Sequence, residues 1–491
     1  MSRAHLYYLS AFALLLHPAW LRASSGTSPA STATSQTSVA IAAAGTSKLP
    51  AAGFTSAARH AEKLASGQDI AIRATDLQQL EMANLSYPTI TARGGVAPYV
   101  TAASKPVPLT RWQTQLADAP VETAYFGMHI HRATTTTPWP KAVSFGTWRL
   151  WDSNVAWMNL EPVKGQWNFT VLDSLVKLAA AHNQQIILPL ALTPQWASAR
   201  PNEVCNYGLG CAAEPTSLAD WQNYVRTVTA RYKGKIAYYE MWNETNLAVT
   251  WTGTPQDLVT MQEEAYTIMK QNDPNAHMIS ANVTGNFGLS YLKTLLELGY
   301  ANSADIIGFH FYVSPSNPEM IAQVAASVES LLTEYGVDKP LWNTETGWHP
   351  PAVFASEDAQ ASTAVRAMVV ARSAGVSRFL WYAWDNHAWV NLFMTEKNSV
   401  SLTLAARAYG NLGKWLIGNT LSPCTAATTG LWSCQLLFKN GQKAEILWSA
   451  ANEQTVTLDS ASVDVQDMYG NARTVTTGSI LVGPDPVLIL K

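Results

Sequence analysis

The feature of the sequence that most constrains the fold is a repeated alternation of short apolar segments with longer helical patterns, beginning near Ala119. Eight apolar segments can be distinguished, and helical stretches such as LDSLVKLAAAH, LADWQNYVRTVTARY, LVTMQEEAYTIMKQ and ASTAVRAMVVARSAG lie between them. This alternation is typical of βα units and a parallel sheet. Eight units predict a closed (β/α)8 TIM barrel over residues 119–418. The eight segments are 123–131, 145–152, 185–193, 236–244, 277–284, 305–312, 340–348 and 378–385.

Each apolar segment ends in polar or aromatic residues, and in this barrel the carboxyl ends of the strands carry the chemistry. Glu244 closes the fourth segment (YYEMWNETNL), and Glu345 lies in the seventh (LWNTETGW). Strands four and seven stand on opposite sides of an eight-stranded ring, so their ends can face each other across its mouth. Two facing carboxyl groups suit glycoside cleavage, in which one protonates the leaving oxygen and the other attacks the anomeric carbon.

Several of these positions resemble glycoside hydrolase clan A. WNET followed by Asn246 resembles the acid/base motif of that clan, usually Trp-Asn-Glu-Pro, and NTETGW resembles its nucleophile segment. The match extends to Arg149 on the second segment, to FHFY on the sixth and to Trp384 on the eighth. Within the clan, IAYYEMWNETN and KPLWNTETGW are most similar to family 39, which implies a β-xylosidase or an exopolysaccharide endoglycosidase.

The resemblance assigns roles residue by residue. It implies that Glu244 is the general acid/base, Glu345 the nucleophile, and Asn243 a hydrogen-bond partner of the sugar 2-hydroxyl. Arg149 and Tyr312 are expected to keep Glu345 ionised, because an adjacent cation and hydrogen-bond donors favour the charged form. Thr245 departs from the clan pattern, which usually has proline there, and we expect proline to add only stiffness to the loop.

Further residues are expected to bind the sugar. The histidines His129, His131 and His310 lie near the ends of the first and sixth segments. The chain also has 19 Trp, whose flat faces suit sugar rings as well as cores. Of Trp148, Trp196, Trp348, Trp381, Trp384 and Trp389 we expect half to line sugar subsites, led by Trp384 and including Trp196 and Trp348, and the others to pack in the core.

Two other functions fit parts of the pattern. His129-Ile130-His131 at the end of a first barrel strand, with His310 and Asp385, could form part of a metal site of a metal-dependent hydrolase. The fifth segment lacks a histidine and the fourth lacks a lysine, so a metal is not predicted. A non-catalytic carbohydrate-binding barrel is disfavoured because both carboxylates are present. No cofactor is predicted.

The charge of the chain indicates the class of its partner, and the N-terminal region indicates its location. A formal net charge of -3 with 14% charged residues provides no basic field for nucleic acid, so we expect an oligo- or polysaccharide substrate. Residues 1–24 resemble a secretory signal peptide, and no other membrane span is found. Residues 25–58 read as a low-complexity tether, and 59–118 as an extension that packs on the body. The sequence predicts a secreted or periplasmic retaining β-glycosidase.

The four cysteines form two close pairs, Cys205/Cys211 and Cys424/Cys434, among three possible pairings. Local bridges in an oxidising compartment are the favoured pairing. After Gly418 the helical patterns stop, and short alternating segments with a turn at Lys439-Asn440-Gly441 predict a small antiparallel, β-sandwich-like domain over 419–491.

Overall fold

The structure is a computed structural model that describes residues 109–460 and 462–491 of the chain. The predicted signal peptide (1–24) and tether (25–58) lie outside the described residues, and so does the predicted extension up to residue 108. The described part of that extension contains the short helix α4 (Arg111–Ala117).

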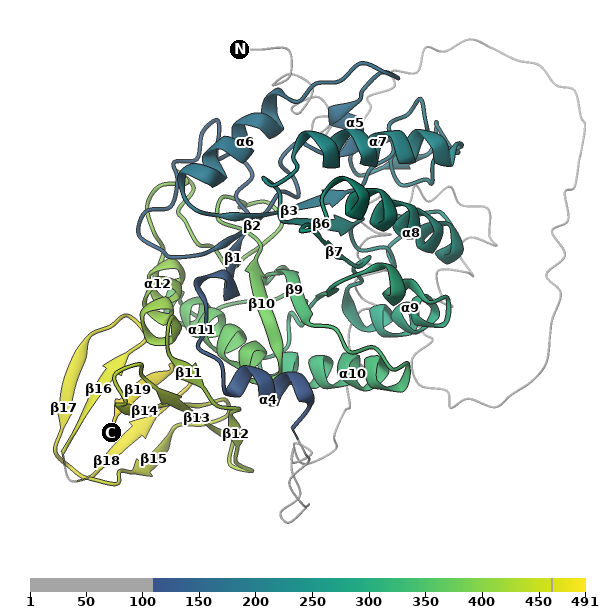
Figure 1. Ribbon diagram of the computed structural model, residues 1–491. Helices are drawn as coiled ribbons and strands as arrows, with labels where there is room; N and C mark the ends of the chain where they lie inside the picture. The colour runs from purple at the N-terminus through teal and green to yellow at the C-terminus, as the bar shows by residue number, and fades with distance from the viewer. Residues whose placement is uncertain (1–108, 461) are drawn as a thin grey trace, which may run out of the picture. The chain divides into compact units, whose positions relative to one another are not determined.

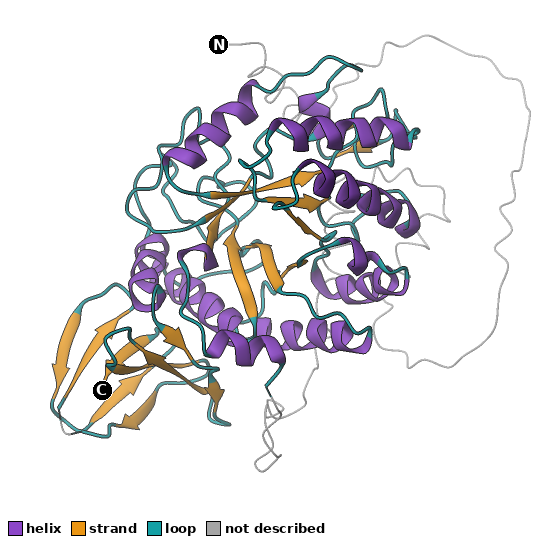
Figure 2. Cartoon of the chain, viewed as in Figure 1, coloured by secondary structure: helices purple, strands orange, loops and turns teal. Residues whose placement is uncertain are grey.

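Eight parallel strands form the barrel (Figures 1 and 2). Their order in the sheet is β7-β6-β3-β2-β1-β10-β9-β8, and a parallel bridge between Ile279 and Ile306 joins the two outer strands. The ring is therefore closed, which confirms the predicted (β/α)8 fold. The strands are β1 (Phe126–Met128), β2 (Thr147–Arg149), β3 (Gln185–Leu190), β6 (Tyr238–Met241), β7 (His277–Ile279), β8 (Ile307–His310), β9 (Leu341–Thr346) and β10 (Val376–Trp381).

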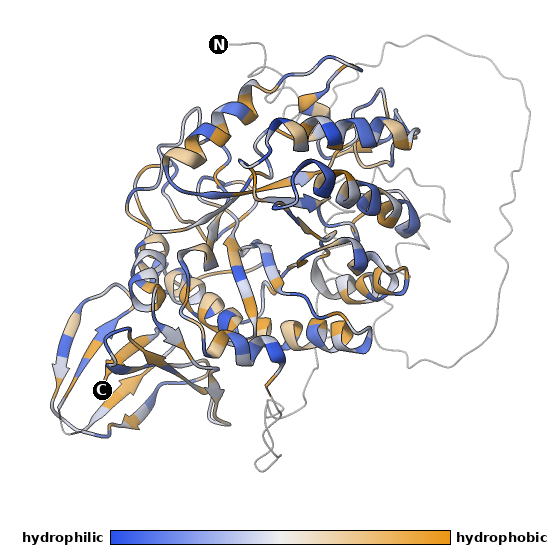
Figure 3. Cartoon of the chain, in the orientation of Figure 1, coloured by the Kyte–Doolittle hydropathy of each residue, from blue (hydrophilic) through white to orange (hydrophobic). Residues whose placement is uncertain are grey.

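Helices surround the strands and carry hydrophobic and hydrophilic residues on the same element (Figure 3). The four stretches predicted as helical are α6, α7, α8 and α11. Helix α8 begins with a capping box, in which the Thr254 hydroxyl accepts from the Asp257 N–H at 3.1 Å while Pro255 occupies the first turn. The helices are α5 (Trp157–Leu160), α6 (Thr170–Ala181), α7 (Leu218–Arg231), α8 (Pro255–Asn272), α9 (Gly285–Glu297), α10 (Met320–Glu334), α11 (Glu357–Ser373) and α12 (Leu404–Leu416), with 3-10 turns η1 (Thr123–Tyr125) and η2 (Tyr300–Ser303).

One unit departs from the predicted alternation, because residues 129–146 connect β1 to β2 without a helix. Their backbone is instead tied to Asp385, which follows β10, the strand next to β1 in the ring. The Asp385 carboxylate accepts from the N–H groups of His131 and Arg132, both at 2.9 Å. Fixed contacts of this kind replace the helix in holding the loop at the carboxyl ends of the strands.

The inside of the barrel is filled by side chains from several strands, some of which are not neighbours in the ring. Tyr238 on β6 and Trp342 on β9 pack at a centroid distance of 4.8 Å, and Arg378 on β10 lies 4.0 Å from the centre of the Trp342 ring. The Arg378 guanidinium also donates to the Tyr238 hydroxyl at 2.9 Å. The interior is therefore a packed core, so a substrate can approach only from an end of the barrel.

The C-terminal strands form antiparallel sheets, as predicted after Gly418. A two-stranded sheet packs on the larger one through a small core that includes Val465, Ile480 and Val482. Trp448 joins this region to the barrel, since its indole N–H donates to Glu319 at 2.7 Å. The strands are β11 (Thr420–Leu421), β12 (Thr425–Ala426), β13 (Leu431–Leu437), β14 (Lys443–Ser449), β15 (Gln454–Thr457), β16 (Val463–Asp467), β17 (Ala472–Val475), β18 (Ser479–Val482) and β19 (Val487–Leu490).

Candidate active site

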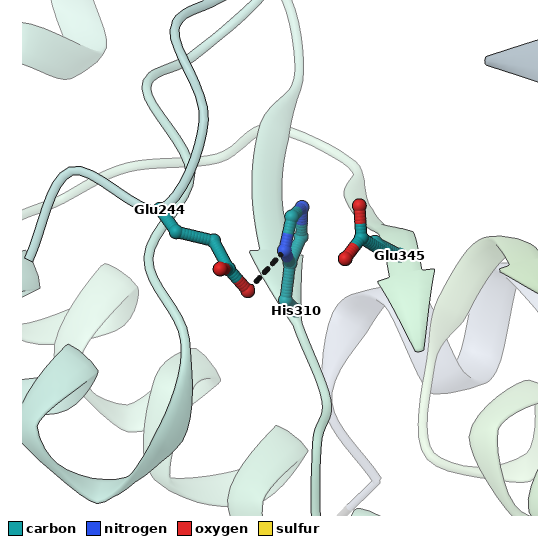
Figure 4. A group of neighbouring side chains, drawn as sticks. All are labelled: Glu244, His310 and Glu345. Atoms are coloured by element: carbon teal, nitrogen blue, oxygen red, sulfur yellow. Dashed lines mark hydrogen bonds and ion pairs between the residues drawn. The ribbon is translucent and has the colours of Figure 1, made fainter. Parts of the chain in front are cut away.

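Residues from four strand ends converge at the mouth of the barrel. Arg149 ends β2, His310 ends β8, Glu345 lies near the end of β9, and Glu244 follows β6. One oxygen of each glutamate and one ring nitrogen of His310 all lie within 4.8 Å of one another. Figure 4 shows the two carboxylates reaching toward His310 from either side. The two glutamates that the sequence singled out are thus neighbours in space.

The Glu345 carboxylate makes the two contacts expected of it. Arg149 Nη1 donates to Oε2 at 2.7 Å, and the Tyr312 hydroxyl donates to Oε1 at 2.8 Å. Burial nevertheless raises the pKa of Glu345 well above its usual range, and the Glu244 and Asp152 carboxylates act in the same direction, against Arg149 and Tyr312. The two donors therefore act against burial and favour the charged form of Glu345, and their role in keeping it ionised stays a prediction.

Arg149 is the centre of a fully buried hydrogen-bond network. Besides Glu345, its Nε donates to Glu240 Oε2 at 2.5 Å and its Nη2 to Asn243 Oδ1 at 2.7 Å. Burial acts to lower the pKa of Arg149, but Glu240 and Glu345 raise it above its usual value. With Oδ1 used by Arg149, the remaining polar group of the Asn243 side chain is its amide N–H₂. Sequence reasoning missed Glu240, although a carboxylate within the apolar run YYEMW was a signal that it needed a buried partner.

The segment that carries Glu244 has a strained backbone held by several bonds. Trp242 and Glu244 have φ of 59° and 44°, in the left-handed region. Glu244 N–H donates to Asn282 Oδ1 at 2.6 Å, the Thr250 hydroxyl to Glu244 O at 2.7 Å, and the Trp242 indole to Thr250 O at 2.7 Å. These contacts fix the direction of the Glu244 side chain, and Asn282 was not among the predicted site residues.

Thr245 has a larger effect than the sequence suggested. Its N–H donates to Asn282 O at 3.1 Å, and its hydroxyl lies 3.1 Å from the same oxygen. Proline has no N–H and could not make the first of these bonds. The departure from the Trp-Asn-Glu-Pro pattern therefore adds a link between β6 and β7 rather than only removing stiffness.

Burial lowers the pKa of His310 and, more strongly, that of His129, and thereby favours the neutral form of each. The Nδ1 atom of His310 lies 2.9 Å from Glu244 Oε1. The Nε2–H of His129 donates to the Thr344 carbonyl at 3.0 Å, since that oxygen can only accept. His310 therefore contacts the predicted acid/base directly, whereas His129 supports the strand that carries Glu345.

The four residues of the alternative metal site do not form a ligand cluster in the described part of the chain. Both Asp385 oxygens are used by the loop 129–146, including a 2.6 Å bond from Thr137, and His131 Nδ1 lies 3.9 Å from Asp385. The metal-like group that does gather is Glu244, His310 and Glu345. Within this group, Glu345 Oε2 already accepts a hydrogen bond from Arg149 Nη1 at 2.7 Å.

The predicted sugar-binding tryptophans differ in their accessibility. Trp348 and Trp384 are each only 2% exposed, and Trp348 stacks against Trp381. Trp196 is partly buried, donates to Glu161 O at 2.9 Å, and has Lys164 over its ring. Trp389, by contrast, is 55% exposed. Substrate contact by these rings remains a prediction.

A second polar group lies beside the first and was missed by sequence reasoning. Asp152 follows β2 and accepts from the hydroxyls of Tyr207 at 2.8 Å and Tyr382 at 2.5 Å. Tyr207 belongs to the hairpin β4 (Val204–Cys205) and β5 (Gly208–Leu209), which the disulfide Cys205–Cys211 closes. The disulfides Cys205–Cys211 and Cys424–Cys434 confirm the predicted pairing. The signal for Asp152 was its place at the end of the second apolar segment.

Comparison with known proteins places this geometry in a family. Residues 150–402 match the model of glycosyl hydrolase family 10, a range that contains Glu244, His310 and Glu345. The chain belongs to glycosyl hydrolase family 10. This confirms the prediction of a clan A glycoside hydrolase; the resemblance to family 39 in particular is not shown.

Individual relatives are distant. Endo-1,4-beta-xylanase C from Paenibacillus barcinonensis is 23% identical over 189 residues, which is 33% of this chain and only 17% of the relative. A glucosidase from Croceicoccus marinus superposes with a TM-score of 0.55 at 15% identity, covering 76% of this chain and 97% of that one. A monomeric beta-xylosidase from Caulobacter crescentus gives 0.55 at 13% identity, covering 77% and 97%. These two structures support the fold. No helix among the described residues is long and apolar enough to cross a membrane.

Proposed function

We propose that the protein is a retaining β-glycosidase that hydrolyses β-linked glycosides or polysaccharide by a two-glutamate double displacement. The observation that carries this proposal is a short distance between the two carboxylates: one oxygen of Glu244 lies within 4.8 Å of one oxygen of Glu345. Retaining enzymes hold their carboxyl groups about 5–5.5 Å apart, whereas inverting enzymes leave about 6.5–9.5 Å for a water molecule. The short separation favours direct attack by a carboxylate.

In the first step, ionised Glu345 attacks the anomeric carbon while protonated Glu244 gives its proton to the leaving oxygen. The bond from the anomeric carbon to the leaving oxygen breaks, and a covalent glycosyl ester of Glu345 forms. In the second step, Glu244 takes a proton from water, which attacks the same carbon and releases Glu345. The Asn243 amide is the proposed donor to the sugar 2-hydroxyl.

The surroundings of each carboxylate support this division of roles. Glu345 has an arginine and a tyrosine hydroxyl as donors, which orient it and favour its charged form. The Glu244 side chain is 16% exposed, compared with 8% for Glu345, so it has the better access to water for the second step. His310 Nδ1 lies 2.9 Å from Glu244 and can accept or return a proton there.

β-Linked xylosides are the proposed first substrates, with exopolysaccharide as the second class. The curated relative is named an endo-1,4-beta-xylanase, and the family 39 resemblance also implies xylosides. The signal-like N-terminus and two disulfides support a secreted or periplasmic location.

Turnover of aryl β-xyloside, aryl β-glucoside and xylan by the full chain tests the proposal. Glu345→Gln is expected to abolish turnover and Glu244→Gln to reduce it strongly, while the exposed Glu263→Gln serves as a charge-matched control on α8. The anomer released first should have the β configuration by NMR. An α product, or activity retained in Glu345→Gln, would refute the mechanism, and activity lost on chelation would favour the metal-dependent alternative.

A further inference from the structure

The pair Asp152 and Tyr207 lies outside the predicted catalytic set but is connected to it on both sides. On one side, the Arg149 guanidinium that binds Glu345 lies 5.7 Å from the centre of the Trp151 ring, and Trp151 packs edge-on against Tyr207 at 5.3 Å. On the other side, Tyr382 N–H donates to Thr346 O, next to Glu345, at 2.7 Å. Both series of contacts end at Asp152, through the hydroxyls of Tyr207 and Tyr382. They hold its carboxylate in a fixed position near the predicted nucleophile, Glu345.

Asp152 is held but not neutralised. Its carboxylate accepts from the two tyrosine hydroxyls, and it forms no ion pair within the described residues. A carboxylate offers about four lone-pair positions, so two hydroxyl donors leave acceptor capacity unused. The Asp152 backbone has a φ of 57°, which turns this residue out of the β2 direction. Asp152 is partly exposed and Tyr207 is 38% exposed, so both can be reached from solvent.

Neighbouring histidines add buried polar atoms without partners in the described structure. His131 Nε2 and His129 Nδ1 have no hydrogen-bond partner. Both rings pack against Tyr382, at centroid distances of 5.0 and 5.2 Å. Buried polar atoms of this kind are normally satisfied. Carboxylate acceptors and ring nitrogens in one place suit a ligand with several hydroxyl groups.

We propose that Asp152, oriented by Tyr207 and Tyr382, is a specificity residue that accepts hydrogen bonds from the hydroxyls of an uncharged sugar unit bound beside Glu345. The disulfide-closed hairpin that carries Tyr207 is then part of the substrate cleft. An anionic sugar such as a uronate would meet the Asp152 and Glu345 carboxylates with Arg149 already occupied, so the site selects neutral sugars. This inference rests on the proposed glycosidase function.

Kinetics on xylotriose with the full chain test the proposal. Asp152→Asn and Tyr207→Phe are each expected to raise KM about tenfold while kcat stays within about threefold of the wild-type value, because a bond to bound sugar is lost but the two glutamates remain. The matched control is Tyr232→Phe, which removes a tyrosine hydroxyl bonded to Asp173 at 2.8 Å between α6 and α7. Its KM should not change.

The role of the hairpin is tested separately by replacing its two cysteines with serine, which removes the disulfide. Cys205→Ser with Cys211→Ser should raise KM for xylotriose as Tyr207→Phe does, whereas Cys424→Ser with Cys434→Ser should leave it unchanged. An unchanged KM in both Asp152→Asn and Tyr207→Phe, or a fall in kcat alone, would overturn the inference. The proposed function would still stand in that case, provided that the wild-type enzyme cleaves the substrate. If the wild-type enzyme cleaves no β-glycoside, the proposed function itself fails.

Discussion

Replacing Arg149 by methionine separates the stabilising role of the buried network from its effect on Glu345. The substitution removes three hydrogen bonds, to Glu240, Asn243 and Glu345, from a side chain with no solvent exposure. Methionine has a similar reach, so the main change is the loss of a positive charge and its donors.

The cost to stability follows from what stays behind. Removing one partner of a buried ion pair typically costs about 3–5 kcal/mol, because the remaining charge is buried without compensation. Here the larger part of this penalty falls on Glu240, since it is completely buried and its Oε1 already lacks a partner. We expect Arg149→Met to lower the free energy of unfolding by about that amount.

The cost to activity has a separate origin. Two opposite charges about 4 Å apart interact by about 4 kcal/mol at an effective dielectric constant of 20. Loss of this attraction disfavours ionised Glu345, the form that attacks, and each 1.4 kcal/mol is a factor of ten in rate. We expect kcat/KM for an aryl β-xyloside to fall by about 10²–10³, with part of the loss recovered at higher pH as Glu345 ionises.

A double variant distinguishes the two effects. Adding Glu240→Gln to Arg149→Met removes the uncompensated charge on β6, so urea unfolding should recover at least about 2 kcal/mol. Activity should not recover, because Glu345 still lacks its cation. If activity returned together with stability, or if Arg149→Met retained activity within threefold, the argument that Arg149 acts on Glu345 would be wrong.

Three further outcomes are expected. Asn282→Ala should lower kcat about 10–100-fold with little change in KM, because Glu244 loses the bond that fixes its strained backbone; equal kinetics to wild type would mean that the other contacts suffice. The acid limb of the pH profile of kcat/KM should have a pKa above the ordinary glutamate value of about 4.3. The pKa of Glu345 is raised, so its ionised, attacking form is lost at a higher pH as the pH falls. An acid limb with a pKa at or below about 4.3 would contradict this. Burial raises the pKa of Glu329 to about 7, so the folded state binds more protons than the unfolded state and stability falls as pH rises from about 4.5 to 7. Glu329→Gln should therefore add about 1–2 kcal/mol to the free energy of unfolding at pH 8 and nothing at pH 4, measured by thermal or urea unfolding. Glu334→Gln, at an exposed position of the same helix, should leave the free energy of unfolding unchanged at both pH values.

Local patterns in the sequence determined the barrel and the two carboxylates. Strand ends are encoded by short apolar runs that stop at polar residues, and this pattern needs no knowledge of the fold. YYEMWNETNL and LWNTETGW could therefore be assigned to facing strands, and the disulfide pairs followed from spacing within a few residues. The same reasoning assumed a helix after every strand, and it was wrong for residues 129–146, which are held by Asp385 instead.

The tertiary structure alone decided which groups surround the carboxylates. Arg149 contacts Glu240 and Glu345 across 91 and 196 residues of sequence, and Tyr207 reaches Asp152 across 55. Such partners depend on the closure of the ring and on loop conformation, which a local pattern does not contain. Burial is also a property of the folded whole, and it acts against Arg149 and Tyr312 on the pKa of Glu345. The Thr245 N–H finds its partner, Asn282 O, only where β6 and β7 lie side by side. The sequence by itself therefore specified where the two carboxylates would meet, and the closed barrel specified their orientation and their neighbours.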